Sequence, residues 1–92
     1  RALKLPILEA AALTHIAQVY SRTGKSREAL TLLKQAESIF RAEKIFEAVA
    51  QVLISTAMVY TGLGEMPQTI EPLNQALQIY RYTFKDLPQQ AI

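Results

Sequence analysis

Residues 13–24 read LTHIAQVYSRTG, and residues 53–64 read LISTAMVYTGLG. The two segments share leucine, alanine, valine, tyrosine and glycine at the same places, forty residues apart. In each segment the last glycine follows the tyrosine by four residues, where a helix ends and a residue with positive φ is favoured. The pair therefore predicts two copies of one helix, each followed by a turn.

The match extends over the whole period. Aligning the sequence with itself at a shift of forty residues, without a gap, gives thirteen identities in forty pairs, whereas average composition gives about two or three by chance. The matched residues of the first copy are Arg1, Ala2, Lys4, Ala10, Leu13, Ala17, Val19, Tyr20, Gly24, Leu33, Gln35, Ala36 and Ile39. A fixed period in this range is the signature of a stacked-repeat architecture.

Apolar residues within each period recur at the spacing of an amphipathic helix, and no alternating strand pattern of useful length is present. The four predicted inner faces are Leu13, Ile16, Ala17 and Tyr20; Ala29, Leu33, Ala36 and Phe40; Val52, Leu53, Thr56, Ala57 and Tyr60; and Ile70, Leu73, Ala76, Leu77 and Tyr80. We therefore expect an all-α chain with helices near residues 6–22, 26–42, 45–62 and 67–84.

Three residues suggest how the second and fourth helices begin. Ser26 is predicted to be an N-cap, because its hydroxyl can accept a hydrogen bond from a free backbone N–H. Pro67 suits a first helical turn, where its missing N–H has no partner to lose. Pro72 lies further in and removes a backbone hydrogen bond, so the early part of the fourth helix should bend or fray.

The small and aromatic residues resemble the tetratricopeptide repeat. The positions that match its pattern are Leu13, Ala17, Tyr20, Gly24, Ala29, Leu33 and Ala36 in the first copy, and Leu53, Ala57, Tyr60, Gly64, Thr69, Leu73 and Ala76 in the second. The resemblance covers residues 7–82 and departs in two respects. The family's usual period is about 34 residues, and Arg41 and Arg81 replace its closing proline. HEAT and armadillo repeats, with periods of about forty residues, are the competing assignment.

The resemblance implies one domain over residues 1–92, a right-handed α-α superhelix of two helix-turn-helix repeats. Repeat one would cover about 3–42 and repeat two about 43–84, with 85–92 starting a further helix or forming a capping tail. Alanines 17, 29 and 57 would let the helices cross closely, and Tyr20 and Tyr60 would fill the space between repeats. Because the chain begins at Arg1 and not Met, we expect it to be a fragment of a longer protein.

In the tetratricopeptide family the first helices of successive repeats line a concave surface that binds peptides. The resemblance therefore implies a binding face formed by Ala11, Thr14, His15, Gln18, Ser21, Arg22, Gln51, Ile54, Ser55, Met58 and Thr61. Apolar burial at Ile54 and Met58 would anchor the partner, and the polar residues would hydrogen-bond it. Alternatively, Ile54 and Met58 pack against a neighbouring repeat or against a second copy of the chain.

Composition argues against several other functions. Cysteine is absent, which excludes disulfides, and a single histidine, His15, offers no converging metal ligands. The net charge is only +2, and Arg22, Lys25 and Arg27 form the one basic cluster, so no nucleic-acid partner is expected. No paired carboxylates, phosphate loop or nucleophile elbow is present, so we expect neither an enzyme nor a cofactor. No apolar run approaches the roughly 18 residues of a membrane span.

The leading hypothesis is thus a scaffold that binds a protein or peptide partner, with a cytoplasmic location as the expectation. A second hypothesis is a structural or regulatory repeat segment of a larger signalling or protease-like protein. A third is self-association into a homodimer through apolar repeat ends, formed by Ile7, Leu8, Leu87 and Ile92.

Overall fold

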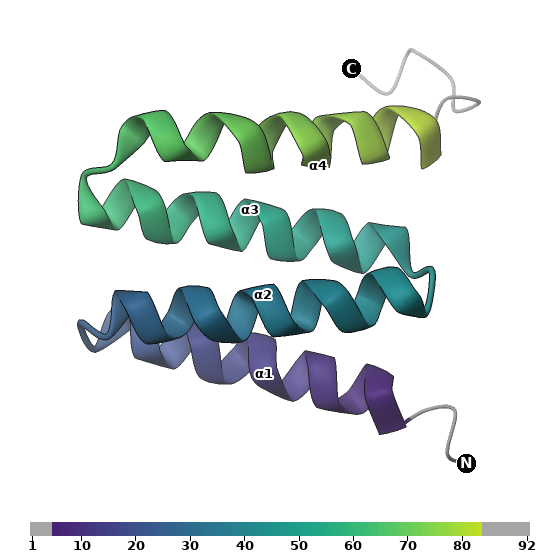
Figure 1. Ribbon diagram of the computed structural model, residues 1–92, viewed down its shortest axis with the longest axis horizontal. Coiled ribbons are helices and arrows are strands. Elements are labelled where there is room, and N and C mark those ends of the chain that lie inside the picture. Colours follow the sequence, from purple (N-terminus) through teal and green to yellow (C-terminus); the bar gives the residue numbers. More distant parts are fainter. Residues whose placement is uncertain (1–4, 84–92) are drawn as a thin grey trace, which may run out of the picture.

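The computed structural model describes residues 5–83 as a row of antiparallel helices in chain order (Figure 1). The elements are α1 (Leu5–Arg22), α2 (Ser26–Ala42), α3 (Phe46–Leu63), the short 3-10 helix η2 (Met66–Thr69) and α4 (Ile70–Thr83). No strand occurs within this range, so the predicted all-α fold of four helices is confirmed there. The expected continuation into residues 85–92, and the apolar ends Leu87 and Ile92, lie outside the described residues.

Each helix packs mainly on its neighbours in the sequence. α2 lies between α1 and α3, and α3 lies between α2 and α4, whereas α1 and α3 approach each other only slightly. The Cα atoms span 40 × 39 × 18 Å, so the helices form a flat slab (Figure 1). The arrangement leaves α1 and α4 at the two ends of the row, each with one neighbour fewer than the helices between them.

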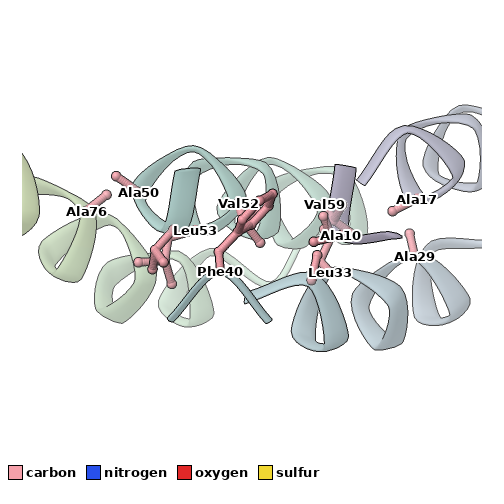
Figure 2. Packing of buried hydrophobic residues seen from close by; sticks show 12 residues of the cluster. Ala10, Ala17, Ala29, Leu33, Phe40, Ala50, Val52, Leu53, Val59 and Ala76 are labelled. Atoms are coloured by element: carbon pink, nitrogen blue, oxygen red, sulfur yellow. The ribbon is translucent and has the colours of Figure 1, made fainter. Parts of the chain in front are cut away.

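Alanine sets the spacing inside each helix pair. Ala17 of α1 faces Ala29 of α2, and Ala50 of α3 faces Ala76 of α4 (Figure 2). All of them are buried, as is Ala57. A methyl side chain lets two helix backbones approach closely, since the distance between packed helix axes depends on the side chains at the contact. The three alanines predicted to lie at helix crossings, Ala17, Ala29 and Ala57, are thus all buried.

Larger side chains fill the centre of the slab. The predicted inner face of α2 is buried throughout, with Leu33 and Phe40 as its large members. Phe40 points toward Val52 of α3 (Figure 2). Tyr20 and Tyr60, expected between the repeats, are both half-buried and not turned into solvent. The main core therefore lies at the junction of the two repeats, where α2 meets α3.

The three turns between helices share one geometry. The residue that ends each turn donates its N–H to the carbonyl of an aromatic residue five positions earlier: Lys25 to Tyr20 (2.8 Å), Ile45 to Phe40 (3.0 Å) and Glu65 to Tyr60 (2.9 Å). The residue before the donor has positive φ in each case: +90° at Gly24, +61° at Lys44 and +78° at Gly64. This is a Schellman closure. The two glycine turns confirm the prediction, while the same turn at Lys44 was not anticipated.

Two helix starts differ from the prediction. Lys25, and not Ser26, is the N-cap of α2, and no side chain makes a capping hydrogen bond there. Ser26 is instead the first helical residue, because the Schellman turn brings the chain into the helix one residue earlier. Before α4 the chain forms η2, which contains Pro67, and the α-helix starts only at Ile70. Pro72 thereby falls in the first turn of α4, where a missing N–H is tolerated, so the expected irregularity is present.

Two predicted inner faces are partly wrong. Ile16 is exposed on α1, whose buried residues are Ala10 and Ala17. On α4 the side chains of Ile70, Leu73 and Leu77 are exposed, and Ala76 carries the burial together with Pro72. Ile7, expected to be an exposed end, packs against the core. Sequence periodicity identified apolar stripes correctly but could not tell which stripes have a neighbour to pack on.

α3 is the most apolar of the helices. Its 18 residues, with a mean hydropathy of 1.3, would by length and composition alone suffice to cross a membrane. The expectation that no segment reaches that length is therefore wrong for Phe46–Leu63. The helix buries Val49, Ala50, Val52, Leu53, Ala57 and Val59. It lies between α2 and α4, and 33% of it is buried there.

Candidate functional site

A groove of about 280 Å³ lies between α1 and α3 and has α2 beneath it. The residues that line it are Ala17, Gln18, Ser21 and Arg22 of α1, Leu33 of α2, and Ser55, Met58 and Val59 of α3. The first helices of the two repeats contribute most of these residues. The groove therefore occupies the surface on which the sequence predicted a binding face.

The floor of the groove is apolar and rigid. Ala17, Leu33 and Val59 are all buried members of the close-packed core region. Ala17 has only a methyl group, so it leaves a depression between the longer side chains around it, and Leu33 closes the depression from below. A partner side chain placed there would contact surfaces that cannot move without disturbing the core.

The walls combine one apolar side chain with several polar ones. Met58 is the largest apolar residue of the rim, with 68% of its surface exposed. Gln18, Ser21 and Arg22 lie on successive positions of one α1 face, three and four residues apart. Ser55 faces them from α3. These polar side chains make no hydrogen bond or ion pair with any other residue of the 5–83 range, so their donors and acceptors are open to a ligand.

Five predicted site residues come together here: Gln18, Ser21, Arg22, Ser55 and Met58. The groove does not include the other six predicted residues: Ala11, Thr14, His15, Gln51, Ile54 and Thr61.

Some residues outside the groove already have partners. The Thr14 hydroxyl donates to the Ala10 carbonyl (2.9 Å), and the Thr61 hydroxyl donates to the Ala57 carbonyl (3.0 Å). Ile54 is half-buried and packs against the hydrophobic core.

Sequence reasoning missed the floor of the groove. Leu33 belongs to the second helix of repeat one, and the prediction looked only at the first helices. Ala17 was assigned to core packing, which it also performs, and Val59 was given no role although it is buried. The sequence did contain a signal for this floor. A small residue on an inner face, followed one helical turn later by longer side chains, leaves a hollow at the helix surface.

Arg22 is the only charged residue of the groove. The other members of the basic cluster are engaged elsewhere. The guanidinium of Arg27 donates to the carboxylate of Glu65, and the ammonium of Lys25 lies 5.7 Å from the centre of the Tyr20 ring. The cluster therefore does not act as one positive patch, and a single cation marks one end of the groove.

Two other hollows have different characters. One of about 330 Å³ lies among α2, α3 and α4, and its lining includes charged side chains such as Lys34, Glu37 and Glu71. Another of about 530 Å³ lies beside Phe46 and Tyr82 and ends at Thr83, the last described residue. The first contains the buried Leu53 and Pro72, but its carboxylates already have partners, Glu37 with Arg41 and Glu71 with Gln75. The second has no buried residue in its lining. The groove between α1 and α3 is therefore the best candidate.

No group of three or more His, Asp or Glu side chains within residues 5–83 is placed to hold a metal ion. The chain matches no protein-family profile, no curated protein and no solved structure. A functional assignment has to come from the groove itself.

Proposed function

We propose that the chain is a protein-interaction module whose groove between α1 and α3 holds an extended segment of a partner protein. The observation that supports this is the combination of a buried apolar floor with hydrogen-bonding side chains that have no partner within the described residues. Peptide segments offer the matching features, since apolar side chains alternate with backbone N–H and C=O groups along an extended chain.

The groove size favours a single anchoring side chain. Its volume of about 280 Å³ is below the roughly 300–1,000 Å³ of typical small-molecule sites. Burying one leucine- or methionine-sized side chain against Met58 and Leu33 contributes about 1.5–3 kcal/mol. Gln18, Ser21 and Ser55 would then hydrogen-bond the peptide backbone on either side of the anchor. Further affinity would come from contacts along the exposed faces of α1 and α3.

Arg22 gives the site a preference. Its guanidinium carries five donors in a planar fork that suits a carboxylate. With no acidic residue lining the groove, an aspartate, glutamate or terminal carboxylate next to the anchor would complement the site. The favoured ligand is therefore an extended segment with an apolar residue flanked by an acidic one.

We also propose that the two helix pairs are tetratricopeptide-like repeats that follow a right-handed superhelical path. The support is the pair of glycine turns with positive φ and the buried alanines at matching positions of both pairs. A structural or regulatory role within a longer protein stays a prediction.

A peptide library displayed on phage tests the groove directly. Peptides of about twelve residues, extended, reach about 40 Å, which equals the longest extent of the molecule. Peptides selected on the wild-type chain would be synthesised and titrated by fluorescence anisotropy. Met58→Glu and Gln18→Glu should each weaken binding about tenfold or more, since 1.4 kcal/mol corresponds to a factor of ten.

Met66→Glu is the matched control, because Met66 is exposed to a similar degree (55%) and lies outside the groove. It should bind within about twofold of the wild type, a change of about 0.4 kcal/mol. Circular dichroism would verify that all variants keep the helical fold. Failure to enrich any peptide, or equal binding by the Met58 variant, would overturn the proposal.

A further inference from the structure

Each end of the helix row carries an exposed apolar stripe. On α1 the stripe consists of Leu5, Leu8, Ala12, Ile16 and Val19. On α4 it consists of Ile70, Leu73 and Leu77. We call these surfaces the α1 stripe and the α4 stripe. Both follow the three- and four-residue spacing of a single helix face, and both lie on the helices with the fewest neighbours.

The internal repeat identifies what each stripe corresponds to. Adding forty residues to the α1 stripe gives Ile45, Ala48, Val52, Thr56 and Val59, which belong to α3 or its N-cap. Of these, Val52 and Val59 are buried, and Ile45 and Ala48 pack against the core. The α1 stripe is therefore the counterpart of the α3 face that turns toward the first repeat.

The α4 stripe has the complementary counterpart. Subtracting forty residues from it gives Leu30, Leu33 and Glu37 of α2. Leu33 is buried, and Leu30 packs against the core. Helices α2 and α3 are in direct contact. Helices α1 and α4 thus carry counterparts of the two faces that meet where α2 packs on α3.

We propose that a second copy of this chain packs its α1 stripe on the α4 stripe of the first copy, in the register of the α2–α3 interface. Copies would join head to tail, which leaves a free stripe at each end of the assembly. Such a heterologous contact does not close on itself unless the rotation between copies returns to the start. Assembly should therefore continue beyond the dimer as concentration rises.

One residue limits the strength of this contact. Forty residues on, the counterpart of Glu9 is Val49, which lies on α3, three and four residues from Val52 and the N-cap Ile45, and is fully buried. Bringing the Glu9 carboxylate to the edge of an apolar junction carries a desolvation cost that Val49 does not have. The contact between copies should be weaker than the contact between α2 and α3, and Glu9→Val should strengthen it.

The junction would also form a second groove. The forty-residue shift places Met58, Thr61 and Leu73 of one copy beside His15 and Gln18 of the next, as counterparts of the existing lining. His15 and Thr61 are predicted site residues that the groove of one copy leaves out. That this second groove binds peptide rests on the proposed function; the assembly itself does not.

Sedimentation velocity without peptide, over a hundredfold range of concentration, measures the association. The wild type should shift from monomer toward dimer and larger species. Leu73→Glu and Ile16→Glu should each lower the association constant about tenfold or more, and Glu9→Val should raise it by a similar factor, each change corresponding to about 1.4 kcal/mol. Glu28→Val adds equal apolar surface to an exposed part of α2 and should leave association unchanged.

Mixing the two blocked variants tests whether the copies join head to tail. Leu73→Glu retains an intact α1 stripe, and Ile16→Glu retains an intact α4 stripe. An equimolar mixture should form a dimer that grows no further, although each variant alone stays monomeric. A wild type and a Glu9→Val variant that both remain monomeric throughout, or a mixture that fails to dimerise, would overturn the proposal. Peptide binding is measured separately, so failure of one proposal is distinguishable from failure of the other.

Discussion

Helices α2 and α4 occupy equivalent places in the two repeats yet differ sharply in burial. Leu33 and Leu73 are identical residues forty positions apart, and their exposed fractions are 1% and 44%. The difference arises because α2 packs on both α1 and α3, whereas α4 packs only on α3 and the η2 turn. The comparison shows that a repeat pattern specifies which face of a helix is apolar, while the number of neighbours decides whether that face is buried.

The largest expected effect comes from truncating the two leucines. Leu33→Ala should lower the free energy of unfolding by about 2–5 kcal/mol, because it opens a cavity where three helices meet. Leu73→Ala removes side-chain atoms that are half in solvent already and should cost less than about 1 kcal/mol. Urea denaturation followed by circular dichroism, at concentrations where the chain is monomeric, would measure both.

Equal losses in the two variants would break the comparison, since they would mean that Leu73 is buried in the monomer as deeply as Leu33. Repeating the Leu73→Ala measurement at high concentration sharpens this point. If copies stack through α4, the cost should grow with concentration, whereas the cost of Leu33→Ala should stay constant.

Substitutions in the turns should give the next largest effect on stability. Gly64→Ala should destabilise the chain by about 1–2 kcal/mol, since a Cβ is unfavourable at positive φ. A Cβ built on Gly64 meets no atom within 4 Å, so the cost would be conformational and not steric. Lys44→Gly should stabilise by up to about 1 kcal/mol, because Lys44 holds the same left-handed conformation at φ +61°. Thermal and urea unfolding would measure both changes.

A destabilising Gly64→Ala and a stabilising Lys44→Gly would show that the turn between the repeats and the turns within them require the same left-handed backbone conformation. Thr23→Ala next to the first turn is a suitable control, because Thr23 is exposed and its hydroxyl bonds only to backbone carbonyls of its own turn. A destabilised Lys44→Gly variant would show that the Lys44 side chain has a role that its geometry does not reveal.

Much of the fold was predictable from the sequence. Helix class, order and approximate bounds follow from apolar spacing and from Gly24 and Gly64, because helical periodicity and positive φ leave direct marks on residue choice. The Lys44 turn was not predicted, since a lysine does not indicate a position with positive φ. Its presence also reveals a period of twenty residues: Leu13, Leu33, Leu53 and Leu73 align, as do Tyr20, Phe40, Tyr60 and Tyr80.

The groove was predictable only in part. Its walls come from the first helices, where the resemblance to a known repeat placed the predicted binding face, although six of the predicted residues lie outside the groove. Its floor depends on Leu33 reaching through from α2, which is a property of how three helices cross. Likewise, the exposure of Ile16 and Leu73 depends on which described helices pack beside α1 and α4. Neither the crossing nor the set of neighbouring helices is encoded in the spacing of residues along one helix.

The smallest expected effect concerns the ion pairs that bridge the repeats. Arg27 at the start of α2 pairs with Glu65 in the turn before η2, and their side chains are 65% and 33% exposed. A double-mutant cycle of Arg27→Ala and Glu65→Ala should give a coupling energy of only about 0.2–1 kcal/mol, because water screens both charges and ordering long side chains has an entropic cost. Urea denaturation at low and high salt would measure the coupling, which should fall as salt rises.

The pair between Arg41 and Glu37 is the matched reference, since it lies within one helix with atoms 2.9 Å apart. Its coupling should be similar, about 0.3–0.5 kcal/mol, and the cycle separates this pair from the hydrogen bond that Arg41 also donates to Gln75 of repeat two (3.1 Å). If both cycles give small values, the repeats are held together by Leu33, Phe40 and the α3 valines and not by charge. A coupling well above that range for Arg27 and Glu65 alone would mean that this ion pair, and not the apolar contacts between α2 and α3, fixes how repeat two packs on repeat one.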